Sequence, residues 1–285
     1  KIHAKISLVV RREGLNIRRY VHLATGNYNP TTAKIYTDLG LFTCRPDFGE
    51  DATNVFNLLT GICQFQAQRK LVVAPFDLHE RLLALVEREA RHARQGLPAR
   101  IILKMNSLAE PQAIAALYRA SQAGVKIDLI VRGICCLRPG VPGLSENITV
   151  RSIVDRFLEH SRIFYFENAC QPQVFISSAD WLPRNFFRRI ELAIPVEDGV
   201  LRERLIHEVL AVSLADTVKA RALRADGSYH RVRMASGAAA VRSQARFIAL
   251  AAGEDPAARP SAKGKPRYPR VTLAPPPFAP RRQKK

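Results

Sequence analysis

Alternation of apolar and polar side chains marks the start of the chain. Apolar residues occupy every second position from Ile2 to Leu8, with polar residues between them. Successive side chains of a strand point to opposite faces, so this alternation predicts a strand with one buried face. Turn residues at Gly14 and Gly26 delimit a second strand around residues 19–23. Two strands of this kind predict an antiparallel beginning to the fold.

Three shorter segments connect this beginning to the rest of the chain. Residues 31–36 open with two threonines and predict a short helix. Residues 43–50 predict a polar connection, and residues 54–60 another short helix. The composition then turns polar and basic over residues 64–70 before an apolar run begins. We place a domain boundary there.

From residue 71 onward, strand patterns alternate with helix patterns. Short apolar runs predict strands, and apolar residues at helical spacing, closed by glycine in two cases, predict helices. An apolar run over 71–75 opens this part. The predicted strands are 101–105, 126–131, 150–153, 163–167, 174–177 and 190–195, and the predicted helices are 78–93, 110–123 and 201–214. Residues 216–246 predict a small terminal element. Alternation of this sort predicts an α/β fold with a sheet flanked by helices.

Charge changes this picture at the carboxyl end. The chain has 44 Lys and Arg against 25 Asp and Glu, a formal net charge of +19. Residues 251–285 hold nine Lys and Arg, two acids and eight of the 18 prolines, so they predict a disordered basic tail. About +12 remains on residues 1–250. The predicted folded part therefore attracts a polyanion: nucleic acid, an acidic membrane surface or a phosphate polymer.

Other whole-chain features exclude several classes of protein. No apolar stretch approaches the roughly 20 residues of a membrane-spanning helix. The five cysteines have no Cys-x-x-Cys spacing, which disfavours a disulfide framework or a zinc site and favours the reducing cytoplasm. The chain opens at Lys1 without Met or a signal-peptide pattern, and we expect it to begin inside a longer protein.

A histidine and a cation recur two residues apart at two places. The pairs are His3 with Lys5, and His160 with Arg162, each in a predicted strand. Period two places both side chains of a pair on one face. Such a pair suits phosphoryl chemistry, because the imidazole attacks phosphorus or moves a proton while the cation neutralises phosphate oxygens. An ordinary strand histidine is the alternative for each pair taken singly, but the repetition favours chemistry.

The motifs around these pairs are also recognisable. A small-polar turn follows each pair, residues 25–29 after the first and 177–181 after the second. This repeat resembles the phospholipase D superfamily, although Val10 stands at the usual first Asp and Glu167 at the second. Longer matches at residues 19–29, 35–38, 129–136 and 177–185 resemble the C-terminal half of bacterial polyphosphate kinases of the long-chain-synthesising type. The resemblance runs from Lys1 to about Ala222.

This resemblance implies a fold, an activity and roles for single residues. It implies a phospholipase D-like mixed sheet, with residues 1–68 as the end of a first catalytic domain and 69–250 as a second. It also implies reversible transfer of the ATP terminal phosphate to polyphosphate, with His3 as the phosphorylated histidine and His160 as a second active-site histidine. Tyr36 and Arg132 match residues that contact ATP, as does His160. The magnesium ligands are expected upstream of Lys1, with no metal site in this chain.

Arginines carry the phosphate-binding prediction independently of the resemblance. The chain has no Gly-x4-Gly-Lys-Ser/Thr loop and no Gly-x-Gly-x-x-Gly, so side chains must hold any nucleotide. Guanidinium groups bind phosphate oxygens in pairs. The candidate phosphate and polyphosphate residues are Lys5, Arg162, Arg184, Arg188 and Arg189. Glu191 follows the arginines and is a candidate to orient Arg189 or a histidine, with a simple salt bridge as the alternative.

Two other functions remain open at this stage. One is a phospholipase D-like phosphodiesterase or nuclease, and the other is a polyanion-binding module without catalysis. For the kinase we expect ATP, ADP and polyphosphate as substrates, a homo-oligomer, no specific nucleic acid, and a cytoplasmic location with peripheral association at the inner membrane face. We expect the chain alone to be inactive, because half of its first domain is missing.

Overall fold

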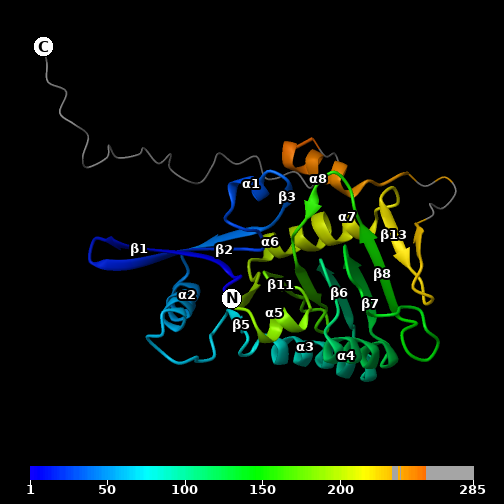
Figure 1. The fold of residues 1–285 in the computed structure, drawn as a ribbon, viewed down its shortest axis with the longest axis horizontal. Helices are drawn as coiled ribbons and strands as arrows, with labels where there is room; N and C mark the ends of the chain where they lie inside the picture. The colour runs from blue at the N-terminus through cyan, green and yellow to red at the C-terminus, as the bar shows by residue number, and fades with distance from the viewer. Residues whose placement is uncertain (233–236, 238, 255–285) are drawn as a thin grey trace, which may run out of the picture.

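The computed structural model describes residues 1–232, 237 and 239–254 (Figure 1). Most of the predicted basic tail, residues 255–285, lies outside the described residues. The last described helix, α8 (Ser243–Ala252), reaches the first two positions of that predicted tail. Among the described residues, no helix is both long and apolar enough to cross a membrane.

A small antiparallel sheet forms the amino-terminal part. Its strands are ordered β1 (Lys5–Glu13), β2 (Asn16–Ala24) and β4 (Gly40–Thr43), with α1 (Pro30–Ala33) and β3 (Tyr36–Thr37) between the last two. The predicted first strand is confirmed from Lys5 onward, with Ile6 and Leu8 partly buried, but Ile2 is exposed and Lys5 is buried, against the predicted alternation. The predicted helix over residues 31–36 is shorter than expected, and Tyr36 is in a strand.

One long helix, α2 (Pro46–Leu59), replaces the predicted connection over 43–50 and the short helix over 54–60. Proline suits the first helical position, where its missing N–H costs nothing, and Asp47 lies favourably in the first turn. Phe48, Ala52 and Val55 recur at spacings of four and three residues and are buried against β2. Polar residues between these three interrupt the apolar pattern, so the sequence did not predict one continuous helix.

A nine-stranded mixed sheet forms the rest of the fold. Its order is β14-β13-β8-β7-β6-β10-β11-β12-β5, and only β6, β7 and β8 are parallel to one another. The strands are β5 (Val72–Ala74), β6 (Arg100–Met105), β7 (Lys126–Val131), β8 (Ile148–Ile153), β10 (Ile163–Phe166), β11 (Gln173–Ser177), β12 (Glu191–Pro195), β13 (Ala220–Leu223) and β14 (Tyr229–Arg231). The predicted α/β fold with a mixed sheet is confirmed.

Helices cover both faces of this sheet (Figure 1). On one face, α3 (Leu78–Arg94) and α4 (Pro111–Gln122) bury apolar stripes against the strands in the largest hydrophobic cluster. On the other face lies a continuous helical stretch formed by α6 (Gly199–Arg204), η1 (Leu205–Leu210) and α7 (Ala211–Leu214). Burial on both faces explains why the central strands are almost wholly apolar.

Contacts between the two sheets bring distant parts of the chain together. Val21 and Leu23 of β2 share a hydrophobic cluster with Leu192 and Ile194 of β12. The short strand β3 pairs in parallel with β9 (Leu158–Glu159). These contacts place both predicted histidine–cation pairs at the junction of the sheets.

Candidate active site

The first histidine–cation pair lies immediately before and at the start of β1. The backbone N–H groups of His3 and Ala4 both donate to the carbonyl of Ile190, at 2.9 Å, which fixes the chain beside β12. The ammonium Nζ of Lys5 lies 2.9 Å from Nε2 of His3. The predicted contact between these side chains is therefore confirmed, although His3 precedes the strand in which it was expected.

A buried carboxylate holds the other nitrogen of His3. Both carboxylate oxygens of Glu191 lie 2.8 Å from Nδ1 of His3, and Glu191 is 0% exposed. The hydroxyl of Ser178 and the amide of Asn185 also donate to this carboxylate, each at 2.5 Å. Of the interpretations left open for Glu191, the histidine-orienting one fits these contacts. An acceptor on Nδ1 places the proton there, so Nε2 carries the lone pair, which faces the ammonium of Lys5.

Lys5 is unusually easy to deprotonate. Burial lowers the pKa of its ammonium to about 8, against a smaller opposing effect from the charge of Glu191. The positive charge of Arg162 lowers this pKa further. Lys5 therefore remains a cation at neutral pH but can release a proton when the local charge changes.

The second pair lies between β9 and β10, so the prediction that His160 and Arg162 are in a strand was wrong. Nη1 of Arg162 is 3.0 Å from Nδ1 of His160, and the guanidinium forms a two-pronged ion pair with Asp180 at 3.1 and 3.0 Å. Nδ1 of His160 is also 3.1 Å from the carbonyl of Thr25, at the end of β2. Burial lowers the pKa of His160 to about 3, with further lowering by Arg162 and Lys5. His160 is neutral in the free protein at pH 7.

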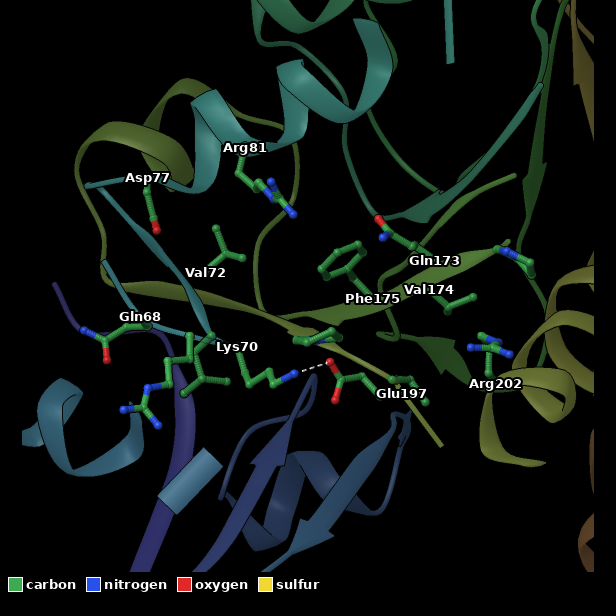
Figure 2. A pocket seen from close by; sticks show the side chains of 15 residues that line it. Gln68, Lys70, Val72, Asp77, Arg81, Gln173, Val174, Phe175, Glu197 and Arg202 are labelled. Atoms are coloured by element: carbon green, nitrogen blue, oxygen red, sulfur yellow. Dashed lines mark hydrogen bonds and ion pairs between the residues drawn. The ribbon is translucent and has the colours of Figure 1, made fainter. Parts of the chain in front are cut away.

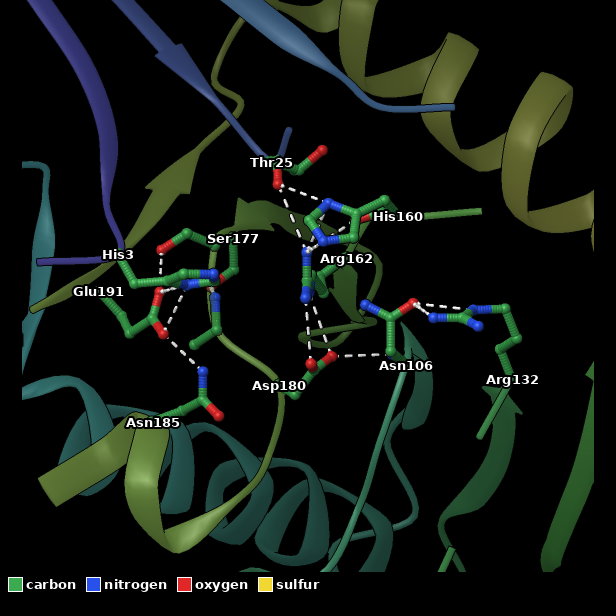
Figure 3. A network of polar contacts seen from close by, with 12 residues as sticks. His3, Thr25, Asn106, Arg132, His160, Arg162, Ser177, Asp180, Asn185 and Glu191 are labelled. Atoms are coloured by element: carbon green, nitrogen blue, oxygen red, sulfur yellow. Dashed lines mark hydrogen bonds and ion pairs between the residues drawn. The ribbon is translucent and has the colours of Figure 1, made fainter. Parts of the chain in front are cut away.

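The two pairs meet in one polar network (Figure 3). Thr25 belongs to the first half of the chain yet accepts from His160 of the second half. The ring of Tyr36 stacks on His160 with centroids 4.9 Å apart. The charge of Arg162 lowers the pKa of Lys5, and the charge of Lys5 lowers the pKa of His160, so the two pairs lie close together. Four of the predicted residues therefore converge with Tyr36 on a single site.

Arg132 joins this network through an intermediary. It follows β7, and its Nε and Nη2 donate to Oδ1 of Asn106 at 3.1 and 3.0 Å. The backbone N–H of Asn106, which follows the neighbouring strand β6, donates to Asp180 at 2.8 Å. Carboxyl ends of parallel strands are the usual place for ligand-binding side chains.

The three remaining predicted arginines lie outside the hydrogen-bonded network. They lie on or just after α5 (Pro183–Phe187), and within the described part of the chain their side chains make no hydrogen bond or ion pair. Arg184 and Arg188 are exposed, whereas Arg189 is partly buried and its charge lowers the pKa of Lys5. Only Arg189 is thereby shown to be near the first pair.

Sequence reasoning missed five residues of this network: Thr25, Asn106, Ser178, Asp180 and Asn185. Thr25, Asp180 and Asn185 fall within motifs used for recognition, but the contacts that give them a role cross long sequence separations. Asn106 follows a buried strand. A polar residue at the carboxyl end of such a strand often binds a ligand, so this position could have marked Asn106 as a site residue.

A separate cavity lies at the other end of β11 (Figure 2). Its volume is about 550 Å³, and Gln173 at the start of β11 lines it, whereas Ser177 at the end of that strand faces the histidine network. Lys70 and Glu197 form an ion pair of 2.7 Å across one side. None of the predicted site residues lines this cavity, so the histidine network remains the candidate site.

Over the described ranges, no three His, Cys, Asp or Glu side chains are grouped so as to hold a metal ion. The buried carboxylates of the site, Glu191 and Asp180, are already engaged by donors. These residues do not form a magnesium site.

Comparisons with known proteins identify the family of this chain. Residues 1–65 match the family model described as polyphosphate kinase C-terminal domain 1, and residues 71–244 match polyphosphate kinase C-terminal domain 2. A polyphosphate kinase of Synechocystis is 56% identical over 89% of this chain, and one of Thermosynechococcus vestitus is 55% identical over 84%. The chain covers 35% and 32% of these relatives, about a third of their length.

A solved structure gives the same result. The crystal structure of polyphosphate kinase from Porphyromonas gingivalis superposes with a TM-score of 0.83 at 41% identity, covering 89% of this chain and 39% of that one. Matching family models over most of the chain, together with relatives of this identity, establish the relationship. The chain belongs to the polyphosphate kinase family.

Proposed function

We propose that the complete protein carrying this chain is an ATP–polyphosphate phosphotransferase that works through phosphorylated His3. One observation carries the proposal: Nδ1 of His3 is held by buried Glu191 while Nε2 lies beside Lys5. A nucleophilic imidazole needs this asymmetry, because one nitrogen must keep its proton and the other must offer a lone pair. The names of the relatives supply the substrate class.

The reaction divides into two balanced steps. In the first, Nε2 of His3 attacks the terminal phosphorus of ATP; a nitrogen–phosphorus bond forms, the bond to the β-phosphate oxygen breaks, and ADP leaves. In the second, a terminal oxygen of polyphosphate attacks that phosphorus and the nitrogen–phosphorus bond breaks. Running the steps backwards regenerates ATP. Glu191 stabilises the positive charge that develops on the imidazole in both directions.

The second pair serves the phosphate oxygens. Arg162, held by Asp180, and Lys5 supply positive charge on both sides of the transferred group. His160 contacts nucleotide phosphate, and a polyanion beside it raises its pKa from about 3, because a nearby negative charge favours the imidazolium. His160 thereby becomes a proton donor only when substrate is bound.

The remaining predicted residues take substrate-binding roles. Tyr36 and Arg132 contact ATP together with His160, and Arg184, Arg188 and Arg189 hold the polyphosphate chain. The exposed guanidinium groups on and after α5 support the latter role, since each unpaired guanidinium offers donors to phosphate. Mg²⁺ accompanies ATP, with ligands outside this chain. We also propose that the complete protein forms a homo-oligomer and associates peripherally with the inner membrane face.

Labelling tests this function. The complete protein is mixed with γ-labelled ATP, and acid-labile, alkali-stable protein phosphate is measured, followed by a chase with unlabelled polyphosphate. We expect label that passes into polyphosphate, disappears in His3→Ala and still forms in His160→Ala. Unchanged label in His3→Ala, or no label in the unmodified protein, would overturn the proposal. Release of nucleotides from DNA would instead indicate a phosphodiesterase.

A further inference from the structure

The side chain of Asn106 lies between two arginines of the site (Figure 3). Its Oδ1 accepts two hydrogen bonds from Arg132, at 3.1 and 3.0 Å. A guanidinium only donates, so the oxygen of the amide must face Arg132. The orientation of the amide group is thereby fixed, and its nitrogen faces away from Arg132.

The amide nitrogen of Asn106 has no hydrogen-bond partner. Within the described part of the chain, Nδ2 is buried and unpaired, and the whole residue is only 6% exposed. Native proteins seldom leave a buried donor unpaired, because removing it from water without a new partner costs free energy. An unpaired donor fixed in a site of this kind indicates that a bound ligand supplies the acceptor.

The surroundings of this nitrogen identify the acceptor. Figure 3 shows Nδ2 directed toward Arg162, on the side of His160. The backbone N–H of Asn106 and the guanidinium of Arg162 both bind Asp180, which fixes their relative position. Two neighbouring donors cannot bond to each other, but an anionic oxygen between them accepts from both. Under the proposed function, the anionic oxygens that enter this site are those of phosphate groups.

We propose that Asn106 is a further catalytic residue, whose Nδ2–H donates to a non-bridging oxygen of the phosphoryl group in transit. The inference rests on the proposed phosphotransfer and assigns the amide no proton transfer. Its contribution is a fixed dipole aimed at charge on the transferred group, in a place from which water is largely excluded. Removing one such donor typically lowers kcat by about 10²–10³-fold.

Two substitutions separate this role from the holding of Arg132. Asn106→Asp keeps an acceptor oxygen for Arg132 but replaces the donor with a negative oxygen, whereas Asn106→Ala removes both. We expect both variants of the complete protein to form phosphohistidine about 10²–10³-fold more slowly with ATP, in single-turnover labelling. If Asn106→Asp labels at the unmodified rate and only Asn106→Ala is slow, the amide merely positions Arg132 and the proposal fails.

A double-substitution cycle gives the same decision if Asn106→Asp does not fold. In an Arg132→Ala background, a donor role predicts that Asn106→Ala still slows labelling at least about tenfold, because the phosphoryl contact is independent of Arg132. A holding role predicts no further loss, which would overturn the proposal. Asn147, an exposed asparagine immediately before β8, gives the charge-matched control Asn147→Asp. Unmodified protein that forms no phosphohistidine would refute the proposed function itself, whereas labelled unmodified protein with fast Asn106→Asp refutes only this inference.

Discussion

Replacing Glu191 by Gln tests the part of the site on which the chemistry depends most. The substitution keeps the shape of a side chain that is 0% exposed, removes its charge and turns one acceptor oxygen into an NH₂ donor. The lost contact is a charge-assisted hydrogen bond of 2.8 Å to Nδ1 of His3. Ser178 and Asn185 donate to different carboxylate oxygens, so only one of them keeps an acceptor in the new amide. The amide NH₂ can also donate to Nδ1, which moves the imidazole proton to Nε2 and removes the attacking lone pair.

The size of the effect follows from these contacts. A hydrogen bond to a charged group contributes about 1.5–3 kcal/mol. At about 1.4 kcal/mol per factor of ten, this corresponds to roughly 10–150-fold in rate. The unfavourable tautomer acts in the same direction, so we expect Glu191→Gln in the complete protein to form phosphohistidine about 10²-fold more slowly or worse.

A second buried histidine–carboxylate pair provides the matched control. Nε2 of His79 lies 3.0 Å from Glu110, which is 3% exposed and also caps α4. Glu110→Gln removes a comparable charge from outside the candidate site and should leave the labelling rate within about threefold of the unmodified protein. Single-turnover labelling with γ-labelled ATP measures both variants. Equal rates for the unmodified protein and Glu191→Gln, or equal losses in the two variants, would refute the reasoning.

Three further outcomes follow from the structure. Gly26→Ala should destabilise this chain by about 1–3 kcal/mol in urea unfolding, because an added Cβ would lie 1.5 Å from Oδ2 of Asp38, whereas Gly199→Ala meets nothing within 4 Å and should change little. The pKa of His160 is about 3 in the folded protein against 6.5 when unfolded, so the free energy of unfolding falls as the pH drops from 6.5 toward 3. His160→Gln should reduce that fall between pH 7 and 5. An unchanged slope of unfolding free energy against pH would contradict this. The 285-residue chain alone should synthesise no polyphosphate from ATP; measurable product would show that this part is sufficient.

Local patterns predicted the elements that depend on local physics. The strands and helices from residue 71 onward follow from apolar runs and helical spacing, and period two placed Lys5 beside His3. The failure at α2 has a local cause too, since polar residues interrupt the stripe of Phe48, Ala52 and Val55. Tyr36 was assigned to a helix because its pairing partner, Leu158, is 122 positions away.

The site itself required the tertiary structure. Glu191 is 188 residues from His3, and nothing in their local sequences shows which histidine or arginine the carboxylate would meet. Thr25 and His160 are 135 residues apart. The residue types of the pairs indicated phosphoryl chemistry, whereas the unpaired amide of Asn106 is a property of packing and could not be read from composition or spacing.

Identifying which nitrogen of His3 carries the phosphate tests the proposed phosphohistidine mechanism most directly. Phosphorylated complete protein, examined by phosphorus NMR against standards of the two phosphohistidine isomers, distinguishes Nε2 from Nδ1. Because Glu191 occupies Nδ1, the account predicts phosphate on Nε2 of His3. Phosphate on Nδ1, or on His160 in place of His3, would contradict it.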